Sequence, residues 1–137
     1  MAIQKIPTKD STGKLNGWMM PLYKKTDDLF RDYDLRFIYA SSIAAGDSKG
    51  PHLHLKRECR LVSISGNAVL TVRRNNQYEK IILDADAPEF VVIKAGDPFS
   101  ISNPGAEDAV VLNLANHIWT IDDQDNHEVE DWSPGEV

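Results

Sequence analysis

The sequence predicts an all-β fold built as one domain and closed into a sandwich or barrel. Short apolar or alternating runs recur between Gly, Pro and Asn turn signals, and no long amphipathic helical pattern interrupts them. Strands that follow one another at spacings of about 8 to 12 residues are typical of such folds. The 137 residues are enough for one independent hydrophobic core.

The chain divides into three parts by composition. Residues 1–34 form a polar N-terminal extension with short strands and a turn of helix that Thr26 is placed to cap. Residues 35–121 hold the barrel, and residues 122–137 form an acidic C-terminal tail that wraps the barrel or frays. The extension is able to form strands, so it can cover a barrel edge that would otherwise invite uncontrolled pairing.

Eight segments of the barrel have the composition of strands. Gly66-Asn67 and Asn75-Asn76 lie between neighbouring segments and are predicted to be two-residue hairpin turns, because Gly and Asn tolerate positive φ. The predicted strands are 35–43, 52–56, 60–65, 68–73, 77–83, 90–93, 99–102 and 109–114.

The overall charge and the single cysteine exclude several classes of protein. A net charge of −6 disfavours nucleic acid and anionic membrane as partners, because both require a basic face. No apolar run approaches the ~20 residues of a membrane helix, and the N-terminus lacks the apolar core of a signal peptide. Cys59 alone cannot form an internal disulfide, so we expect a soluble cytoplasmic protein.

The stretch between Gly46 and Gly66 is the most informative part of the sequence. It carries two of the chain's four histidines and a glutamate inside a glycine-bounded frame. Alternate side chains of an extended strand share one face. Four residues would therefore point the same way, into the mouth of a closed barrel: His52, His54, Lys56 and Glu58. The alternative is a surface strand that carries two histidines.

This stretch resembles the first signature motif of the cupin superfamily. Within it the chain resembles the dTDP-sugar 3,4-ketoisomerases, whose Arg-Gly-x-His-Ala-His is matched by Lys-Gly-Pro-His-Leu-His at 49–54 and whose upstream tyrosine is matched by Tyr39. More distantly it resembles dTDP-4-dehydrorhamnose 3,5-epimerase, whose Lys-Leu-Val-Arg-x-x-x-Gly is similar to residues 60–66. The resemblance implies a single-domain cupin, a jelly-roll or double-stranded β-helix barrel, that forms a homodimer and often exchanges N-terminal strands.

Two positions depart from these families. Phe99 stands where the second cupin motif has a metal-ligating histidine, so the better match is to the metal-free sugar enzymes, which use no cofactor. The alternative is a triad of His52, His54 and Glu58 that holds iron. Asn113 stands where the epimerases place a catalytic tyrosine, and an amide does not supply that proton. The resemblance therefore favours 3,4-ketoisomerisation over 3,5-epimerisation.

The catalytic residues that the resemblance implies are His52, His54 and Tyr39. Removal of a C3 proton from a 4-keto sugar gives an enediolate, and this step needs a base with a pKa near neutrality and a donor near the oxyanion. His52 occupies the position of the base, His54 is placed to shuttle the proton or orient the first ring, and Tyr39 to polarise the ketone. The alternatives are a packed interior role for His54 and a strand-end role for Tyr39.

The remaining candidates would bind the substrate. Lys49 and Arg60 replace an arginine and a lysine of the two families, and they would meet phosphate or sugar oxygens. Trp119 would stack on thymine or pack in the core, and Glu58 would contact substrate or pair with Lys56 or Arg60. The candidate substrate-binding residues are Lys49, Arg60, Glu58, Lys94, Asn113 and Trp119.

Three functions are compatible with such a site. The favoured one is an isomerase of a dTDP-4-keto-6-deoxyhexose in polysaccharide or deoxysugar biosynthesis, with a nucleotide-linked sugar as its small-molecule partner. The second is a non-catalytic cupin that binds a sugar nucleotide or a related anion. The third is a metal-dependent oxygenase that uses the two histidines and the glutamate.

Overall fold

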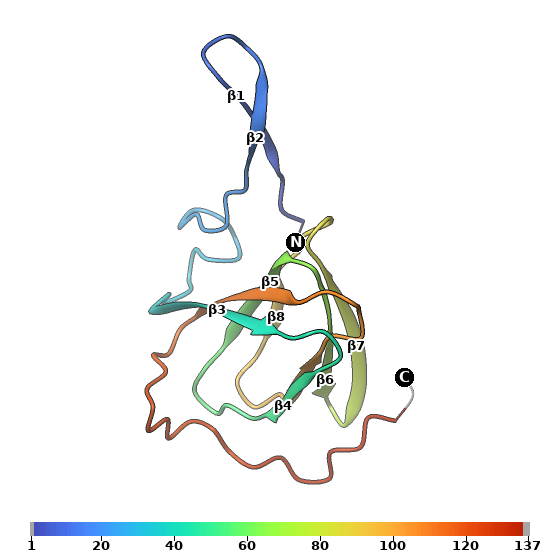
Figure 1. Cartoon of the computed structure of the whole chain (residues 1–137). Helices are drawn as coiled ribbons and strands as arrows, with labels where there is room; N and C mark the ends of the chain where they lie inside the picture. Colours follow the sequence, from blue (N-terminus) through green and yellow to red (C-terminus); the bar gives the residue numbers. More distant parts are fainter. Residues whose placement is uncertain (1, 136–137) are drawn as a thin grey trace.

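Two facing antiparallel sheets of four strands each form the barrel, which confirms the all-β prediction (Figure 1). The computed structural model describes residues 2–135, and no helix forms within them. The described residues therefore include no helix of the length and apolarity that a bilayer crossing requires. The strands are β1 (Ile6–Lys9), β2 (Leu15–Met19), β3 (Phe37–Ile43), β4 (Ser48–His52), β5 (Cys59–Ser65), β6 (Asn67–Arg74), β7 (Gln77–Asp84), β8 (Val91–Ile93), β9 (Phe99–Ser102) and β10 (Ala109–Ala115).

The chain crosses repeatedly between the two sheets. One sheet has the order β3-β10-β5-β8 and the other the order β4-β9-β6-β7. Within the barrel strands, β6 and β7 are joined by a hairpin, in which Arg74 pairs with Gln77. Double sheets connected in this way are jelly rolls, and their closed form brings strands from both sheets to one mouth.

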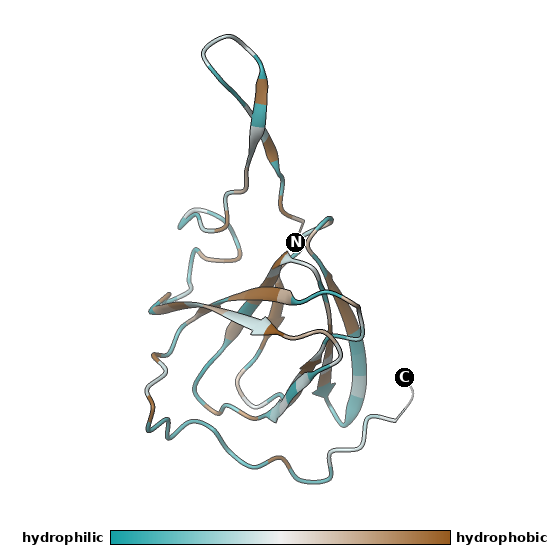
Figure 2. Ribbon diagram, viewed as in Figure 1, coloured by the Kyte–Doolittle hydropathy of each residue, from teal (hydrophilic) through white to brown (hydrophobic). Residues whose placement is uncertain are grey.

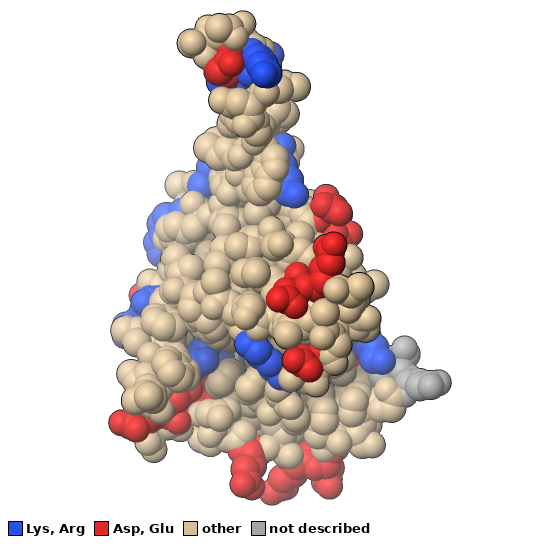
Figure 3. All heavy atoms as spheres, viewed as in Figure 1, with Lys and Arg blue, Asp and Glu red and all other residues tan. Residues whose placement is uncertain are grey.

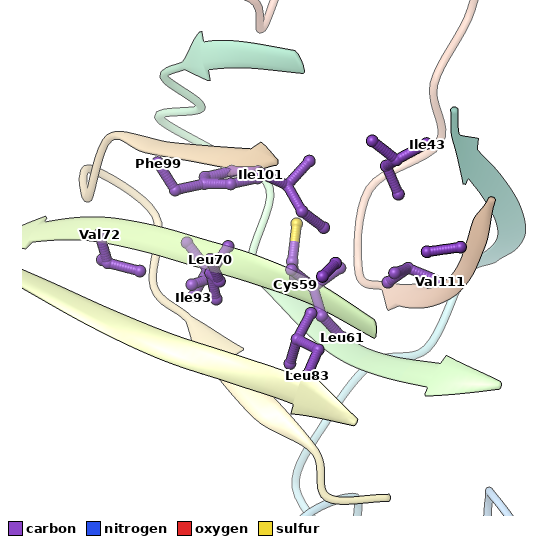
Figure 4. Close-up of a cluster of buried hydrophobic side chains, with 12 residues drawn as sticks. Ile43, Cys59, Leu61, Leu70, Val72, Leu83, Ile93, Phe99, Ile101 and Val111 are labelled. Atoms are coloured by element: carbon purple, nitrogen blue, oxygen red, sulfur yellow. The ribbon is translucent and has the colours of Figure 1, made fainter. Parts of the chain in front are cut away.

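Aliphatic side chains from both sheets meet between the layers and form the main core (Figure 4). Leu61 of β5 is 5% exposed and Leu70 of β6 is fully buried. In β10, Val111 and Asn113 are buried while the residue between them is half-buried, which is the alternation of a strand with one face on a core. Figure 2 shows the apolar stretches concentrated on these central strands.

A second apolar cluster covers the outer face of the β3-β10-β5-β8 sheet. Phe30 and Tyr33, from the chain segment before β3, pack against Val62 and Leu114. The Tyr33 hydroxyl lies 2.6 Å from the carbonyl oxygen of Glu58 and 2.9 Å from that of Leu114. This cover explains why the first five residues of β5 are all buried, on both faces of the sheet.

Two segments extend from the barrel at opposite ends. The β1–β2 hairpin projects from one end, and the C-terminal tail runs beneath the other (Figure 1). The tail is fastened by a β-bridge between Leu53 and His127 and by Arg73, whose Nη1 donates to the carbonyl oxygen of Glu130 at 2.9 Å. Asp and Glu side chains gather along this lower edge (Figure 3). Met1 of the predicted extension and residues 136–137 of the predicted tail lie outside the described residues.

One predicted strand is wrong in a way that matters for the site. The sequence predicts a strand over 52–56, but β4 (Ser48–His52) ends where that strand should begin. The backbone N–H groups of Leu55, Lys56 and Arg57 donate instead to the carboxylate of Asp125, at 2.9, 3.0 and 2.8 Å. Because these donors are taken, residues 54–58 form a loop, and their side chains do not alternate.

The turn predictions have mixed outcomes. Asn75 and Asn76 have φ values of 52° and 61° and form the predicted hairpin turn between β6 and β7. Gly66-Asn67 is not a hairpin turn, because β5 and β6 belong to different sheets. Gly66 has φ 68°, and a Cβ there would lie 2.7 Å from the Asp108 carbonyl oxygen, so this crossover requires glycine. The predicted turn of helix after Thr26 is a series of hydrogen-bonded turns instead.

Candidate functional site

A cavity of about 500 Å³ opens at the end of the barrel that the C-terminal tail crosses. Its volume lies within the range of small-molecule sites, about 300 to 1,000 Å³. Strand β3, the end of β4, the loop after it and the tail all contribute to its wall. The lining residues are Phe37, Tyr39, Ser41, His52, His54, Arg57, Trp119, Asp123 and Asn126.

The two imidazoles of the motif face this cavity as a nearly parallel pair. The ring centroids of His52 and His54 are 6.2 Å apart, and the ring planes differ by 10°. Phe99 of β9 lies behind both rings, with centroid distances of 5.7 and 6.0 Å. Phe99, which replaces the second-motif histidine, thus supplies an apolar backing to the pair.

The C-terminal tail fixes the tautomer of His54. Its Nδ1 lies 2.8 Å from the backbone carbonyl oxygen of Asp125. A carbonyl oxygen only accepts, so Nδ1 carries the proton and the neutral ring keeps a free lone pair on Nε2. The side chain of His54 is 8% exposed, and Nε2 is therefore a base held in a largely dry wall.

Both imidazoles are tuned to stay neutral. Burial lowers the pKa of His52, and the nearby charges of His54 and Arg57 lower it further. Burial likewise lowers the pKa of His54, with Arg57 adding to the effect while the Asp125 carbonyl opposes it. At neutral pH the pair is therefore available to accept protons.

Tyr39 stands on β3 opposite Asn113 of β10, in the same register position. The side-chain Nδ2 of Asn113 donates to the Tyr39 hydroxyl oxygen at 2.7 Å, so the phenol keeps its own proton to donate. Burial raises the pKa of Tyr39, with Cys59 adding to the rise, and this keeps the phenol protonated. The register places a neutral proton donor beside the imidazole pair.

A smaller compartment of about 80 Å³ lies deeper in the barrel and shares Tyr39, Ser41 and His52 with the main cavity. Lys49 and Asn113 line it. The Lys49 ammonium group donates to the Ser41 hydroxyl at 2.8 Å.

Six of the nine residues predicted from sequence line one or other compartment: His52, His54, Tyr39, Lys49, Asn113 and Trp119. The structure places the other three elsewhere. Glu58 pairs with Arg60 at 2.6 Å, and the Arg60 guanidinium lies 3.5 Å from the Tyr33 ring centroid on the outer face of the sheet. Lys94 is exposed and lines neither compartment.

The alternative metal triad is not assembled in this structure. Glu58, its third member, is turned towards Arg60 and does not line the cavity with His52 and His54. Among residues 2–135, no group of three or more His, Cys, Asp and Glu side chains is arranged to hold a metal ion.

Sequence reasoning missed the residues that reach the cavity from the loop after β4 and from the tail. Arg57 is 3% exposed, and its Nη2 donates to Asp123 at 2.7 Å. Asn126 lines the same wall. The alternation expected of a strand would point residue 57 away from the histidines, so the wrong strand prediction concealed Arg57. The acidic run 122–125 was a visible signal for a basic partner.

The fold is that of RmlC-like cupin structures. The sequence matches one family model, described as the polysaccharide biosynthesis C-terminal domain, over residues 29–127. The chain therefore belongs to that family. No curated protein matches the sequence.

Several solved structures of bacterial proteins share this fold. The capsular polysaccharide assembling protein CapF from Staphylococcus aureus matches with a TM-score of 0.65 and 23% identity over 88% of this chain. The chain spans only 36% of that protein's length. The sugar 3,4-ketoisomerase QdtA from Thermoanaerobacterium thermosaccharolyticum, crystallised with TDP, matches with a TM-score of 0.71 and 19% identity over 96% of this chain and 88% of its own.

The RmlC epimerase of Mycobacterium tuberculosis is a further structural match. Its TM-score is 0.72 at 16% identity, over 94% of this chain and 66% of the epimerase. At these identities the similarity concerns the fold, and the chemistry has to be argued from the residues of this chain.

Proposed function

We propose that the protein is an isomerase of a nucleotide-linked keto sugar that acts on a dTDP-4-keto-6-deoxyhexose by acid–base enolisation without a metal. The observation that carries this proposal is the parallel pair of His52 and His54 in one cavity with the Tyr39 hydroxyl. A neutral base, a second proton carrier and a protonated phenol are the three groups that an enolisation needs. The ligand class is supported by QdtA, which shares the fold and was crystallised with TDP and, as a mutant, with TDP-4-keto-6-deoxyglucose.

The reaction balances with the groups in the cavity. One imidazole takes the proton from C3, while Tyr39 donates a hydrogen bond to the ketone oxygen on C4 as negative charge develops there. The resulting enediol is protonated at C4 by an imidazolium. The C3 hydroxyl loses its proton as it becomes the new ketone, and the oxygen on C4 gains one. His54, whose Nε2 lone pair is fixed by the Asp125 carbonyl, shares the role of base with His52.

The 3,4-ketoisomerisation is favoured over 3,5-epimerisation because of Asn113. Its amide occupies the strand position of the epimerase tyrosine, and its Nδ2 is committed to the Tyr39 oxygen. An amide does not deliver a proton to C5.

The test is incubation with dTDP-4-keto-6-deoxyglucose in deuterated water, followed by proton NMR of the sugar. We expect a 3-keto product with deuterium introduced by the enzyme and no exchange at C5. The His52→Asn/His54→Asn variant should introduce no deuterium above background. Its matched control is His117→Asn, because His117 lines neither compartment. Deuterium at both C3 and C5 would instead indicate epimerisation, and dTDP-sugar binding with no exchange would indicate the non-catalytic alternative.

We infer that the protein works as a homodimer joined through the β1–β2 hairpin. Leu15, Trp18 and Met19 of β2 are 62%, 53% and 53% exposed on a hairpin that projects from the barrel (Figure 1). A two-stranded hairpin alone is marginally stable in water, so burial against a second copy would stabilise it. The proposed location is the cytoplasm, consistent with a free, buried Cys59.

The oligomeric state can be measured by light scattering after size exclusion. A dimer is expected for the wild type, and the Leu15→Lys/Trp18→Lys variant should be a monomer with an intact barrel. A monomeric wild type at micromolar concentration would overturn the dimer without affecting the proposed chemistry.

A further inference from the structure

Arg57 places a buried positive charge in the wall of the cavity. The residue is 3% exposed and lies among the side chains that line the cavity with His52, His54 and Tyr39. Its Nη2 forms an ion pair with Asp123, whose own side chain is 8% exposed, at 2.7 Å. Its Nε is buried and has no hydrogen-bond partner within the described residues.

This arrangement is costly for the fold. A buried N–H without an acceptor gives up its hydrogen bond to water without a replacement, and the cost is larger when the group is charged. One carboxylate satisfies only part of a guanidinium, which has five N–H donors. Buried polar atoms that lack partners call for an explanation, and in a residue that lines a cavity a binding role is one.

The position of the guanidinium is fixed by two acidic residues of the tail. The backbone N–H of Arg57 donates to the carboxylate of Asp125 at 2.8 Å, and its side chain is held by Asp123. The same Asp125 holds His54 through its backbone carbonyl. The tail thus holds both the Arg57 guanidinium and the His54 imidazole in place. Electrostatic stabilisation of a transition state requires groups that are fixed in this way before the reaction.

The geometry points to Arg57 as the residue that binds the oxyanion of the enediolate, donating to the sugar oxygen on which negative charge develops when the imidazole pair removes the C3 proton. This inference rests on the proposed function. The imidazoles and the phenol share the wall with Arg57, so the guanidinium meets the reacting end of the sugar and not the diphosphate. The planar guanidinium group can donate two parallel hydrogen bonds, which suits the two neighbouring oxygens of an enediolate, on C3 and C4.

Arg57 has a second measurable effect on the site. Its charge adds to burial in lowering the pKa of His52 and of His54, and it is also among the groups that lower the pKa of Tyr39. The other groups that act on His52 are His54 and Lys49, which lower its pKa, and Asn126, which raises it. The charges of Asp125 and Asp123 raise the pKa of His54. Loss of the Arg57 charge should therefore raise the pKa of the catalytic imidazoles. Arg57→Lys, which keeps the charge, separates this effect from the rise that hydration of the cavity would also cause.

The experiment compares Arg57→Gln, the neutral double variant Arg57→Gln/Asp123→Asn and Arg57→Lys. The double variant removes both charges together, so it keeps a folded barrel even if Arg57→Gln leaves Asp123 buried and unpaired. Arg31→Gln is the matched control, because Arg31 forms a surface pair with Asp28 at 61% and 82% side-chain exposure. Melting curves establish folding, and NMR gives the rate of deuterium entry and its pH profile. Calorimetry gives the affinity for dTDP.

We expect the double variant to exchange C3 about 100- to 1,000-fold more slowly, as loss of one oxyanion donor does. Its affinity for dTDP should stay within about twofold. The acid limb of the pH profile should move upwards in Arg57→Gln, whereas in the double variant the loss of Asp123, whose charge raises the pKa of His54, opposes that shift. The exchange rate of Arg57→Lys should lie between those of the wild type and Arg57→Gln. Wild-type exchange in the double variant would overturn the role of Arg57, and so would loss of dTDP affinity in step with the rate. A wild type that exchanges nothing would instead overturn the proposed function.

Discussion

The chain has two buried arginines close together in sequence, Arg60 on the outer face of the β3-β10-β5-β8 sheet and Arg57 in the loop before β5, and they are used differently. On the outer face, Arg60 stacks on Tyr33, and its Nε and Nη1 donate to the Leu29 carbonyl at 3.0 Å and to Glu58 at 2.6 Å. On the cavity side, Arg57 has one ion pair and a buried Nε without a partner. Arg60 therefore serves packing, whereas we assign Arg57, which lines the cavity, to contact with a ligand.

The largest expected effect belongs to the cavity side. Replacing His52 or His54 by Asn should slow conversion of the keto sugar by about 100- to 10,000-fold, because general acid–base catalysis contributes that much. NMR-monitored turnover measures the rate, and the melting temperature should change little for His52. Retention of more than a tenth of the wild-type rate in both variants would break the assignment of the cavity as the reacting face.

A substitution on the outer face should lower the stability of the protein and leave its turnover number unchanged. Arg60→Met removes the stacking on Tyr33 and the hydrogen bonds to Leu29 and Glu58, so we expect a loss of about 2 to 4 kcal/mol in the free energy of unfolding. Denaturant titration gives this value. The turnover number of the fraction that stays folded should equal that of the wild type. A lower turnover number would return Arg60 to the substrate-binding role that the sequence predicts.

Sequence reasoning succeeds where the structure depends on a local pattern of residues. The sequence predicts strands such as 77–83 and 109–114 closely, because a short run with apolar residues between turn signals indicates a strand locally. The Asn75-Asn76 turn is also predicted correctly, because Asn tolerates the positive φ that this turn requires. The glycine-framed motif located the cavity because His52 ends a strand at the barrel mouth.

The parts that sequence reasoning missed depend on a contact between distant residues. The Asp125 carboxylate takes the N–H groups of residues 55–57 and turns a predicted strand into a loop. No local pattern around Arg57 reports a partner that comes from the tail. The same contact sends the side chain of Arg57 to the cavity, while Glu58 pairs with Arg60.

Asp125 connects the loop after β4 to the tail. Its replacement should have an intermediate effect on both stability and reaction rate. Asp125→Asn removes the charge that accepts three backbone N–H groups, so we expect about 1 to 3 kcal/mol lower stability. The rate should fall as well, because His54 and Arg57 are positioned by this contact. Unfolding curves and turnover of the folded protein test the two effects. Unchanged values in both would contradict the role of the tail.

The smallest effect is the pH dependence of stability. Burial raises the pKa of the Asp125 carboxyl, but the N–H groups of Arg57, Leu55 and Lys56 outweigh it, and the pKa lies below 3.8. Its contribution to stability is complete above pH 3.8 and is lost as the pH falls through the folded-state pKa. The pKa values of His52 and His54 lie below 6.5 in the folded protein, so the unfolded chain binds more protons and stability also declines as the pH falls below 6.5.

Melting temperatures measured between pH 8 and pH 3 separate the contribution of the histidines from that of Asp125. The decline just below pH 6.5 should shrink in the His52→Asn/His54→Asn variant, and the decline below pH 3.8 should shrink in Asp125→Asn. A wild-type stability that rises on acidification from pH 7 to pH 5 would contradict the directions of both histidine shifts.

The most direct measurement is the initial rate at which solvent deuterium enters the sugar ring of dTDP-4-keto-6-deoxyglucose, compared between the wild type, the His52→Asn/His54→Asn variant and Arg60→Met. The account predicts rapid exchange for the wild type and for folded Arg60→Met, and none above background for the histidine variant. Equal exchange by the histidine variant, or none by the wild type, would contradict it.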